Sequence, residues 1–401
     1  MLAFQSGQLR KLVLHAYETV NFYKRLFDNT GLTPNDIKSI EDLGKIPIVD
    51  KKVMADYPPK DLLSNLYNIN YLIPVKTAGS NGMPFLFYID HNFDQFRKAQ
   101  ALRPYITNGR RLRDNSVVFS VHPKPANKWY RYLGLMQDHY EYSGSSIKDQ
   151  INLILKKKPD VIQGYGSVLS LLSAQIIEEK INLPRPKLIF SDSELLTPDM
   201  RDNIENAFRN KVIDIYGTYE TDNIAYECSS HNGYHIAVDS VIMEFIKQGK
   251  PVKPYEEGEI VVTVLNNFAM PFIRYNLHDI GSYSEKHCSC SRTFPLLNKI
   301  DGRANDYMVT EDGRKLSFFN IAYFDKLAPN VREYQIVQED FNRFNIFIVP
   351  GHGYQNHGEN VIMPAIKKFF PDGDIKVNVV PKIDREQSGK FKAFKSKVNT
   401  G

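Results

Sequence analysis

The pattern of apolar and polar positions predicts an amphipathic helix near the start of the chain. Apolar residues recur there at helical spacing, at Leu9, Leu12, Val13, Ala16 and Val20. One apolar stripe with polar residues on either side is typical of a helix that packs on a core. Two further helix starts, at residues 33–36 and 39–42, each place a hydroxyl residue three positions before an acid.

In the middle of the chain, short apolar runs alternate with helical patterns. Residues 117–119, 187–190 and 212–215 have the β-branched and aromatic composition of buried strands. Residues 168–179 have the pattern of a helix, and the Thr-Pro-Asp sequence at residues 197–199 predicts another helix start. This alternation is typical of a parallel sheet with helices on its faces, so it predicts an α/β architecture.

The last part of the chain has a different pattern. Strands of antiparallel character follow at residues 235–238, 241–246 and 258–264. A charged cluster at residues 301–306 then precedes a segment with its own strand–helix alternation. We therefore predict a mixed α/β fold with a large N-terminal domain at residues 1–301, a domain boundary at residues 302–306 and a small α+β domain at residues 307–401.

Composition narrows the class of protein. The length of 401 residues indicates two domains or three. The composition, 42% hydrophobic and 24% charged, is typical of a globular protein. The net charge of +5 is mild, whereas nucleic-acid binding needs a concentrated basic stripe, so we expect no nucleic-acid partner. No apolar run approaches the length of a membrane span, and charges stand where a signal peptide needs an apolar core. We expect no membrane partner and a cytoplasmic location.

A loop rich in glycine and hydroxyl residues lies between two apolar runs, at residues 77–84. Its backbone N–H groups and the hydroxyls of Thr77 and Ser80 can bind phosphate oxygens. The spacing of a Walker loop is absent. An ordinary hairpin loop is the alternative.

The second polar stretch is Tyr216 to Glu220. The strand at residues 212–215 is predicted to end at Tyr216 and Gly217, where glycine allows a sharp turn, and open α/β sheets bind ligands at such strand ends. A tyrosine ring, threonine hydroxyls and an acid can stack on a base, bind phosphate and hold Mg²⁺. The preceding predicted strand also ends in a polar segment that includes Glu194, so both ends would line one crevice. A plain polar turn is the alternative.

Two later residues, Asp279 and Lys390, are further candidates for the same site. Asp279 lies two positions before a glycine, and its carboxylate suits a ribose diol, although an aspartate there is also a common turn residue. Lys390 follows Gly389 close to the C-terminal end, where a solvated basic tail is the alternative.

In this order, the stretches resemble the motifs of the adenylate-forming superfamily, and within it the phenylacetate-CoA ligase-like and capsule-biosynthesis (CapK-type) branch. Residues 77–84 resemble the Ser/Thr/Gly-rich phosphate loop, and residues 216–220 are similar to the Tyr-Gly-x-Thr/Ser-Glu motif. Arg274 and Tyr275 with Asp279 resemble the ribose motif Arg-Tyr-x-x-Gly-Asp.

The resemblance continues to the end of the chain. Residues 302–306 resemble the hinge motif Gly-Arg-x-x-Asp, and residues 388–390 resemble the terminal motif with the catalytic lysine. The resemblance therefore implies a hinge at residues 302–306 and a mobile domain at residues 307–401. Three positions depart from the family pattern: Tyr219 replaces a hydroxyl residue, His278 replaces the glycine before the ribose-binding acid, and Asn305 stands where the hinge often has Asp.

The resemblance implies an ATP- and Mg²⁺-dependent ligase. Such an enzyme activates a carboxylic acid as an acyl-adenylate and passes the acyl group to CoA, to a carrier-protein thiol, or to an amine or hydroxyl acceptor. The protein must hold two anions in line and neutralise their charge. The implied roles are Lys390 on the α-phosphate and carboxylate oxygens, Glu220 on Mg²⁺, Thr77, Ser80 and Thr218 on phosphates, Tyr216 with Gly217 at the adenine, Asp279 on the ribose, and Glu194 and Arg303 as further nucleotide-binding residues.

The three cysteines stand in two short motifs, Cys228-Ser229-Ser230-His231 and Cys288-Ser289-Cys290. Three cysteines and one histidine are an established ligand set for structural zinc, so we predict a closed Zn²⁺ site from Cys228, His231, Cys288 and Cys290. His235 competes as the fourth ligand, His287 does so more weakly, and free buried cysteines are the alternative. The resemblance favours zinc, because members of this branch have similar cysteine motifs at matching places.

Two other hypotheses compete with a ligase. A nucleotide-binding protein without chemistry would account for Tyr219, and a zinc-organised scaffold would account for the cysteines. The presence of Lys390, Glu220 and Asp279 favours the ligase.

Overall fold

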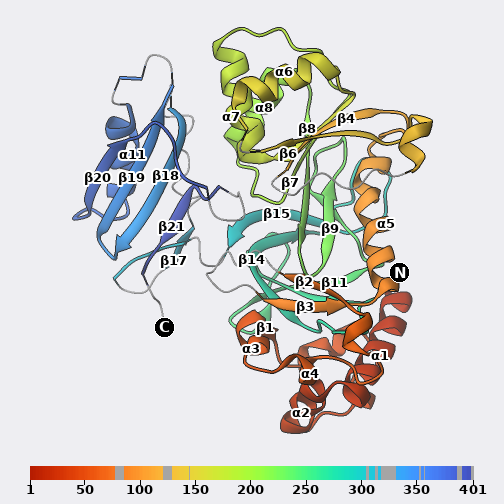
Figure 1. Ribbon diagram of the computed structural model, residues 1–401. Helices are drawn as coiled ribbons and strands as arrows, with labels where there is room; N and C mark the ends of the chain where they lie inside the picture. The colour runs from red at the N-terminus through yellow and green to blue at the C-terminus, as the bar shows by residue number, and fades with distance from the viewer. Residues whose placement is uncertain are drawn as a thin grey trace. The chain divides into compact units, whose positions relative to one another are not determined.

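The computed structural model describes residues 1–76, 85–120, 129–143, 145–303, 307–311, 315–317, 331–351, 354–355, 357–385 and 391–398. The chain forms two compact units, each made of two segments. Figure 1 shows the helices and strands of the chain, coloured from red at the N-terminus to blue at the C-terminus. Unit 1 contains Met1–Gly109 and Ile215–Ile300, and unit 2 contains Arg110–Asp214 and Asp301–Gly401. The boundary after Asp214 falls inside strand β8 (Val212–Thr218).

All helices that the structure describes in unit 1 lie in its first segment. They are α1 (Leu2–Thr19), α2 (Asn21–Thr30), α3 (Lys51–Ala55), α4 (Pro59–Leu62) and α5 (His91–Thr107), with short 3₁₀ helices at Pro34–Asp36, Ile40–Lys45 and Ile69–Tyr71. The stripe predicted on α1 is buried, because Leu9, Leu12 and Val13 are fully covered. Both predicted helix starts are confirmed as capping boxes at Thr33 and Ser39, although each begins only a 3₁₀ turn.

A mostly antiparallel sheet completes unit 1. Its strand order is β12 (Lys250–Pro251), β11 (Val241–Lys247), β13 (Gly258–Val264), β14 (Tyr275–Ser284), β15 (Leu296–Arg303), β10 (Tyr234–Ile236), β9 (Asp222–Glu227) and β8. The short strand β1 (Val49–Asp50) joins β14 as a parallel neighbour. The antiparallel strands predicted from the sequence are therefore confirmed. A separate hairpin consists of β2 (Ile73–Lys76) and β3 (Leu86–Ile89).

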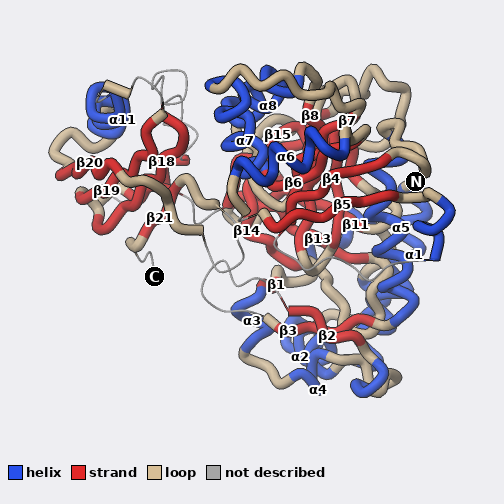
Figure 2. The backbone as a smooth tube through the Cα atoms, turned by 45° about the horizontal axis from the view of Figure 1, so that its top comes forward, coloured by secondary structure: helices blue, strands red, loops and turns tan. Residues whose placement is uncertain are grey.

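The first segment of unit 2 is the predicted α/β part. Strands β5 (Gln137–Tyr142), β4 (Asn115–Ser120), β6 (Val161–Tyr165) and β7 (Leu188–Asp192) pair in parallel in this order. Helices α6 (Ile147–Lys157), α7 (Gly166–Glu178) and α8 (Pro198–Phe208) alternate with them along the chain and pack beside them, and a 3₁₀ helix spans Trp129–Leu133 (Figure 2). The predicted start of α8 is confirmed, because Thr197 Oγ1 accepts the N–H of Met200 at 3.3 Å.

The second segment of unit 2 has its own core. Strands β20 (Asp374–Val379), β19 (Arg343–Pro350), β18 (Val331–Asp340) and β21 (Phe394–Ser396) form a four-stranded sheet in this order, with α11 (His357–Lys367). A small hairpin consists of β16 (Tyr307–Val309) and β17 (Lys315–Ser317). Ile336, Phe344 and Ile362 are fully buried in the core of this segment.

The predicted mixed α/β class, with parallel strands and antiparallel additions, is confirmed. Among the helices within the described ranges, none combines the length and the apolar character that a bilayer span requires.

Candidate functional site

Strands β8 and β14 bring two of the predicted motifs together in unit 1. Tyr216 lies on β8 and Asp279 on β14, and the Tyr216 hydroxyl donates a hydrogen bond to Asp279 Oδ2 at 2.7 Å. Asp279 is 8% exposed. A tyrosine ring and a carboxylate that are far apart in the sequence therefore form one oriented pair.

Glu220 lies in the turn after β8 and is held by Tyr275, a residue of the predicted ribose motif. Its Oε1 accepts a hydrogen bond from the buried Tyr275 hydroxyl at 3.1 Å. Burial raises the pKa of Tyr275, and the charge of Glu220 raises it further, so the phenol stays protonated as a donor. The carboxylate is 8% exposed, and one of its two oxygens is fixed in direction.

The turn after β8 is stabilised by two threonines. The N–H of Thr218 donates to Thr221 Oγ1 at 3.2 Å, and the two hydroxyl oxygens are 3.1 Å apart. Thr221 is 2% exposed, which marks it as a buried support for the turn. The sequence analysis did not select Thr221, although a hydroxyl residue beside a turn is a usual sign of such support.

The predicted sharp turn at Gly217 is wrong. Strand β8 continues through Gly217 to Thr218 and pairs with β9, with a register shift between Tyr216 and Gly217. Glycine is needed there for space, because a Cβ on Gly217 would lie 2.1 Å from the carbonyl oxygen of Asp222. The turn begins only at Tyr219.

Arg274 has a structural role in this fold. Its guanidinium makes two hydrogen bonds to Glu244, at 3.1 and 3.0 Å, and a third to the carbonyl oxygen of Ile46 at 2.5 Å. The side chain is 4% exposed. Sequence reasoning missed Glu244, whose signal was an acid inside an otherwise apolar strand pattern. A buried arginine needs such a partner.

The departure at His278 has a backbone explanation. His278 has φ +57°, in the left-handed region that favours glycine, which is the residue that the family motif has here. Its N–H donates to Asn276 Oδ1 at 2.8 Å, and its Nε2 lies 3.0 Å from Asp50 Oδ2. These two contacts hold a strained residue directly beside Asp279.

Glu194 lies in unit 2, after β7. Its carboxylate accepts hydrogen bonds from the N–H of Ser167 at 3.1 Å and from the N–H of Phe391 at 2.7 Å. Burial raises the pKa of Glu194, against the opposing effect of these hydrogen bonds.

Three predicted residues, Thr77, Ser80 and Lys390, lie outside the described residues, and so does the side chain of Arg303. The backbone of Arg303 is the last residue of β15. The nucleotide-binding roles of these four residues remain predictions.

The cysteine motifs come together in unit 1, and the structure places His235 in the cluster in place of the predicted His231. Cys228, Cys288, Cys290 and His235 place their ligand atoms within 4.8 Å of one another. The sulfurs of Cys228 and Cys288 are 3.5 Å apart, and Cys290 Sγ is 3.2 Å from His235 Nε2. His231 instead lies in the turn after β9, with Nδ1 at 3.4 Å from Glu227 Oε2.

Electrostatics favour the metal-binding form of two groups in this cluster, His235 and Cys290. Burial lowers the pKa of His235, which keeps its imidazole neutral. Burial alone would raise the pKa of Cys290, but the N–H and guanidinium of Arg292 together with Cys288 and Cys228 outweigh it and lower the pKa to about 7. Burial raises the pKa of Cys228. A neutral imidazole and an easily ionised thiol are the forms that bind zinc.

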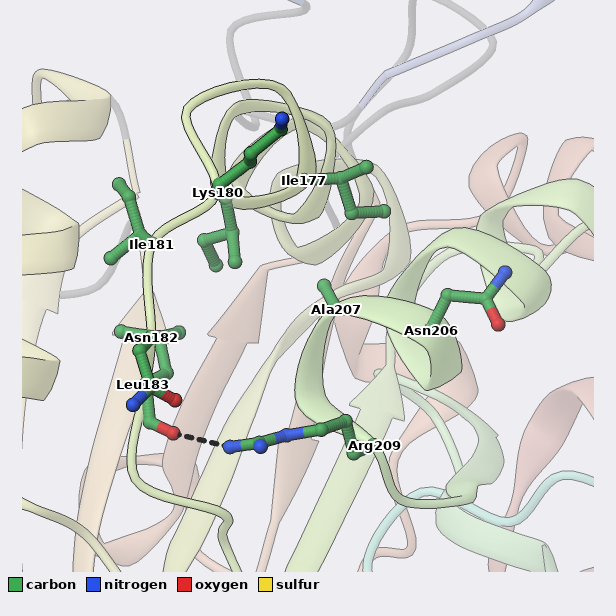
Figure 3. A pocket seen from close by; sticks show the side chains of 9 residues that line it. Ile177, Lys180, Ile181, Asn182, Leu183, Asn206, Ala207 and Arg209 are labelled. Atoms are coloured by element: carbon green, nitrogen blue, oxygen red, sulfur yellow. Dashed lines mark hydrogen bonds between the residues drawn. The ribbon is translucent and has the colours of Figure 1, made fainter.

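Unit 2 also contains a pocket of about 290 Å³ at the C-terminal ends of α7 and α8 (Figure 3). Ile177, Ile181, Leu183 and Ala207 line it, and the Arg209 guanidinium donates to the Leu183 carbonyl oxygen at 2.7 Å. Its lining contains none of the predicted motif residues, so we do not assign the pocket to the candidate site.

Comparisons with known proteins agree with the motif pattern. Residues 308–397 match the family model of the CapK C-terminal domain. The chain is 25% identical over 325 residues to the phenylacetate-coenzyme A ligase of Thermus thermophilus, a match that covers 77% of this chain and 71% of that protein. It is 23% identical over 367 residues to Protein CapK of Staphylococcus aureus, with 87% and 78% covered.

Among solved structures, 2-hydroxyisobutyryl-CoA ligase in the postadenylation state matches with a TM-score of 0.79 and 22% identity. The match covers 98% of this chain and 89% of that one. At this identity the likeness is evidence for the fold, and it agrees with the mixed α/β class.

Proposed function

Because the chain is related to the phenylacetate-CoA ligases and to CapK of the adenylate-forming ligases, as its motifs predicted, we propose that it activates a carboxylic acid with ATP and transfers the acyl group to CoA. Its relatives support an acid–CoA ligase. The intermediate of the proposed reaction is an acyl-adenylate, formed when the acid attacks the α-phosphorus and pyrophosphate leaves. The cytoplasm, where ATP and CoA are available, is the proposed location.

The observation that supports this proposal most is the convergence of two motifs on adjacent parts of unit 1. Tyr216 donates to Asp279, and Tyr275 donates to Glu220. Each hydrogen bond joins one residue of the second motif to one residue of the ribose motif. Two independent cross-links of this kind favour a single nucleotide site over two unrelated polar turns.

The proposed roles follow from these contacts. Asp279 would accept hydrogen bonds from the ribose hydroxyls, and its bond from Tyr216 fixes the direction of the carboxylate. The Tyr216 ring and Gly217 would lie against the adenine, and Thr218 would donate to phosphate. Thr77, Ser80, Arg303 and Lys390 keep the roles that the resemblance implies, with Lys390 neutralising charge on the α-phosphate and the carboxylate.

Glu220 is the proposed ligand for Mg²⁺. Carboxylate oxygens are preferred ligands of this hard cation, and Glu220 is held in place by the Tyr275 hydroxyl. When bound, Mg²⁺ would neutralise phosphate charge and help to orient the polyphosphate.

Cys228, His235, Cys288 and Cys290 are the proposed ligands of a structural Zn²⁺. With Zn–S bonds of about 2.3 Å and a Zn–N bond of about 2.1 Å, the ligand atoms of a tetrahedral site lie roughly 3.5 to 3.8 Å apart. The separations of 3.5 and 3.2 Å in the cluster are close to these values. Four protein ligands would leave no open position, so the ion would support the fold and take no part in the chemistry.

Pyrophosphate release tests the proposal. The purified protein would be incubated with ATP, Mg²⁺ and a panel of acids that includes phenylacetate and 2-hydroxyisobutyrate, and the active acid would then be tested with CoA, a carrier-protein thiol, amines and alcohols. We expect acid-dependent pyrophosphate release and thioester formation with CoA. Lys390→Ala is the matched control and should lose about 10² to 10³ in the adenylation rate while still binding ATP. Pyrophosphate release that does not depend on any acid would contradict the proposal.

A further inference from the structure

The loops that precede strands β4, β5 and β6 form one surface of unit 2. The three strands are parallel, with β4 between β5 and β6, so their amino ends meet at the same edge of the sheet. The Met136 N–H donates to the Leu112 carbonyl oxygen at 2.6 Å, and the Asn115 side-chain amide donates to the Lys157 carbonyl oxygen at 3.1 Å. Open α/β sheets bind their ligands at the opposite, carboxyl ends, so a nucleotide is not expected here. We call residues 110–114, 129–136 and 155–160 the amino-end surface.

Four large apolar side chains are exposed on the amino-end surface. On the 3₁₀ helix before β5, Trp129 is 73% exposed, Tyr132 is 83% exposed and Leu133 is 63% exposed. Leu112 is 58% exposed in the loop before β4. Single exposed apolar side chains are common, whereas four on two loops that are joined by a hydrogen bond favour an interaction site.

Exposed cations lie in the same loops. Arg111 and Arg113 flank Leu112, and Lys156 and Lys158 lie where α6 ends and the chain leads to β6. All four cations are exposed.

The acids in and beside these loops do not neutralise the four exposed cations, because other cations already contact them. Three acids are matched by three such cations: Lys187 lies 3.0 Å from Asp114 and 2.8 Å from Asp160, and Arg110 and Arg131 lie 2.5 and 3.6 Å from Asp138. The charges of these six groups cancel. The four exposed cations therefore give the amino-end surface a positive charge.

We propose that the amino-end surface binds the headgroup region of a membrane that contains anionic lipids. Tryptophan and tyrosine rings are favourable at that depth, the two leucines reach the acyl boundary, and the lysines and arginines contact lipid phosphates. The sequence predicted no membrane partner because it contains no span, but a contact of this kind lies on the bilayer surface and needs none. The inference does not depend on the proposed ligase activity.

The combination of side chains favours lipid over other partners. Nucleic acid would bind the cations, but its phosphate backbone offers the two leucines no apolar contact. A second copy of the chain that paired through the same surface would bring the four exposed cations against their own copies, which is repulsive. A bilayer with anionic headgroups satisfies both the cations and the apolar side chains.

Co-sedimentation with vesicles tests the proposal. The protein would be mixed with vesicles of phosphatidylcholine alone and with vesicles of equal parts phosphatidylcholine and phosphatidylglycerol. We expect binding to the anionic vesicles that is lost at about 1 M salt, where the Debye length falls to about 3 Å. Trp129 is the single tryptophan of the chain, so a blue shift of the protein's tryptophan fluorescence should accompany binding. No binding to the anionic vesicles at low salt, or equal binding to both kinds, would overturn the proposal.

The charge variants have a matched control on the same helix. Lys148 and Lys156 are both exposed on α6, but Lys148 lies in its first turn and Lys156 in its last. Each cation near an anionic surface changes the affinity about fivefold. Lys156→Gln and Arg113→Gln should therefore each weaken vesicle binding about fivefold, and the double variant about 25-fold, whereas Lys148→Gln should leave it unchanged. An equal loss in Lys148→Gln would show attraction to net charge alone and would contradict the assigned surface.

The apolar contribution is tested at Trp129. Trp129→Ser should weaken vesicle binding by about tenfold or more. Tyr142→Ser is the control, because Tyr142 is 60% exposed at the carboxyl end of β5, and it should bind like the wild type. All these variants change exposed side chains, and an unchanged Tm verifies that each is folded. Wild-type binding by a folded Trp129→Ser protein would refute the proposed contact.

Two further measurements test other partners. A dimer in sedimentation velocity that Trp129→Ser dissociates would make this surface an interface between copies and would overturn the proposal. Polyglutamate and a DNA oligonucleotide serve as anionic probes without lipid. If either bound as tightly as the anionic vesicles, with the same losses in Trp129→Ser and Lys156→Gln, the assignment to lipid would be wrong.

Discussion

Substitutions of the two histidines near the cysteines, His231 and His235, should have opposite effects on zinc retention. His235 Nε2 lies 3.2 Å from Cys290 Sγ, whereas His231 Nδ1 lies 3.4 Å from Glu227 Oε2, and the two residues are only four positions apart. We expect the wild type and His231→Ala to retain one equivalent of Zn²⁺ after purification without chelator. His235→Ala should retain much less, because a closed site would lose one of its four ligands.

The size of the effect on stability follows from mass action. A ligand that binds only the folded state stabilises it by about 4 kcal/mol when its free concentration is a thousand times Kd. The cluster lies wholly in unit 1, which has roughly 200 residues, and for a domain of that size 1 kcal/mol shifts Tm by about 2–4 °C. Saturating zinc should therefore raise Tm by about 8–16 °C in the wild type and in His231→Ala.

Metal analysis and calorimetry, each with and without a strong chelator, measure both effects. Comparing each protein with itself removes the packing cost of truncating the buried His235 side chain. A wild type that contains no zinc and has the same Tm with and without chelator would refute the site. Retention of zinc by His235→Ala together with its loss in His231→Ala would restore the ligand set predicted from the sequence.

Substitutions at three further positions test the rest of the candidate site. Glu220→Gln should raise the Mg²⁺ concentration needed for half-maximal pyrophosphate release, because an anionic ligand becomes a neutral amide, and unchanged Mg²⁺ dependence would leave Glu220 a structural residue. Gly217→Ala should destabilise the fold by more than about 3 kcal/mol in urea unfolding, because its Cβ would lie 2.1 Å from the Asp222 carbonyl oxygen. A loss of stability below about 1 kcal/mol would show that β9 can move aside. His278→Gly should change the free energy of unfolding by less than about 1 kcal/mol, because relief of the left-handed backbone offsets the lost contact with Asp50. His278→Val should cost more than about 2 kcal/mol, because a β-branched residue is strained in this conformation. Equal stabilities of the two variants would contradict this account.

Local patterns determined many of the elements. The β-branched run at residues 212–215 became part of β8, and the Thr197 hydroxyl caps α8 as its place before Pro198 predicted. Such signals succeed because side-chain periodicity and caps act within a few residues. The predicted strand end at Gly217 was wrong for the complementary reason. The sequence alone does not distinguish a glycine that is required by a close neighbouring strand from a glycine that is required by a turn.

The order of the motifs along the chain also determined the expected family, which the relatives support. The cysteine motifs also identified the three cysteines of the cluster, but they did not identify its histidine, His235. The spacing of Cys228 and His231 suggested a local ligand pair, yet β10 returns antiparallel to β9 and pairs His235 with Tyr226, close to the end of the strand that leads to Cys228. Strand register therefore selected the histidine that lies in the cluster, and register depends on pairing between segments.

Only the tertiary structure decided which polar side chains are partners. Glu244 with Arg274, Tyr275 with Glu220, and Glu194 with the Phe391 N–H are contacts between residues that are 30, 55 and 197 positions apart. No periodicity or cap relates positions at such separations. A buried charge or hydroxyl must be paired, and the partner is whichever group the packing of distant strands and helices brings within hydrogen-bonding distance.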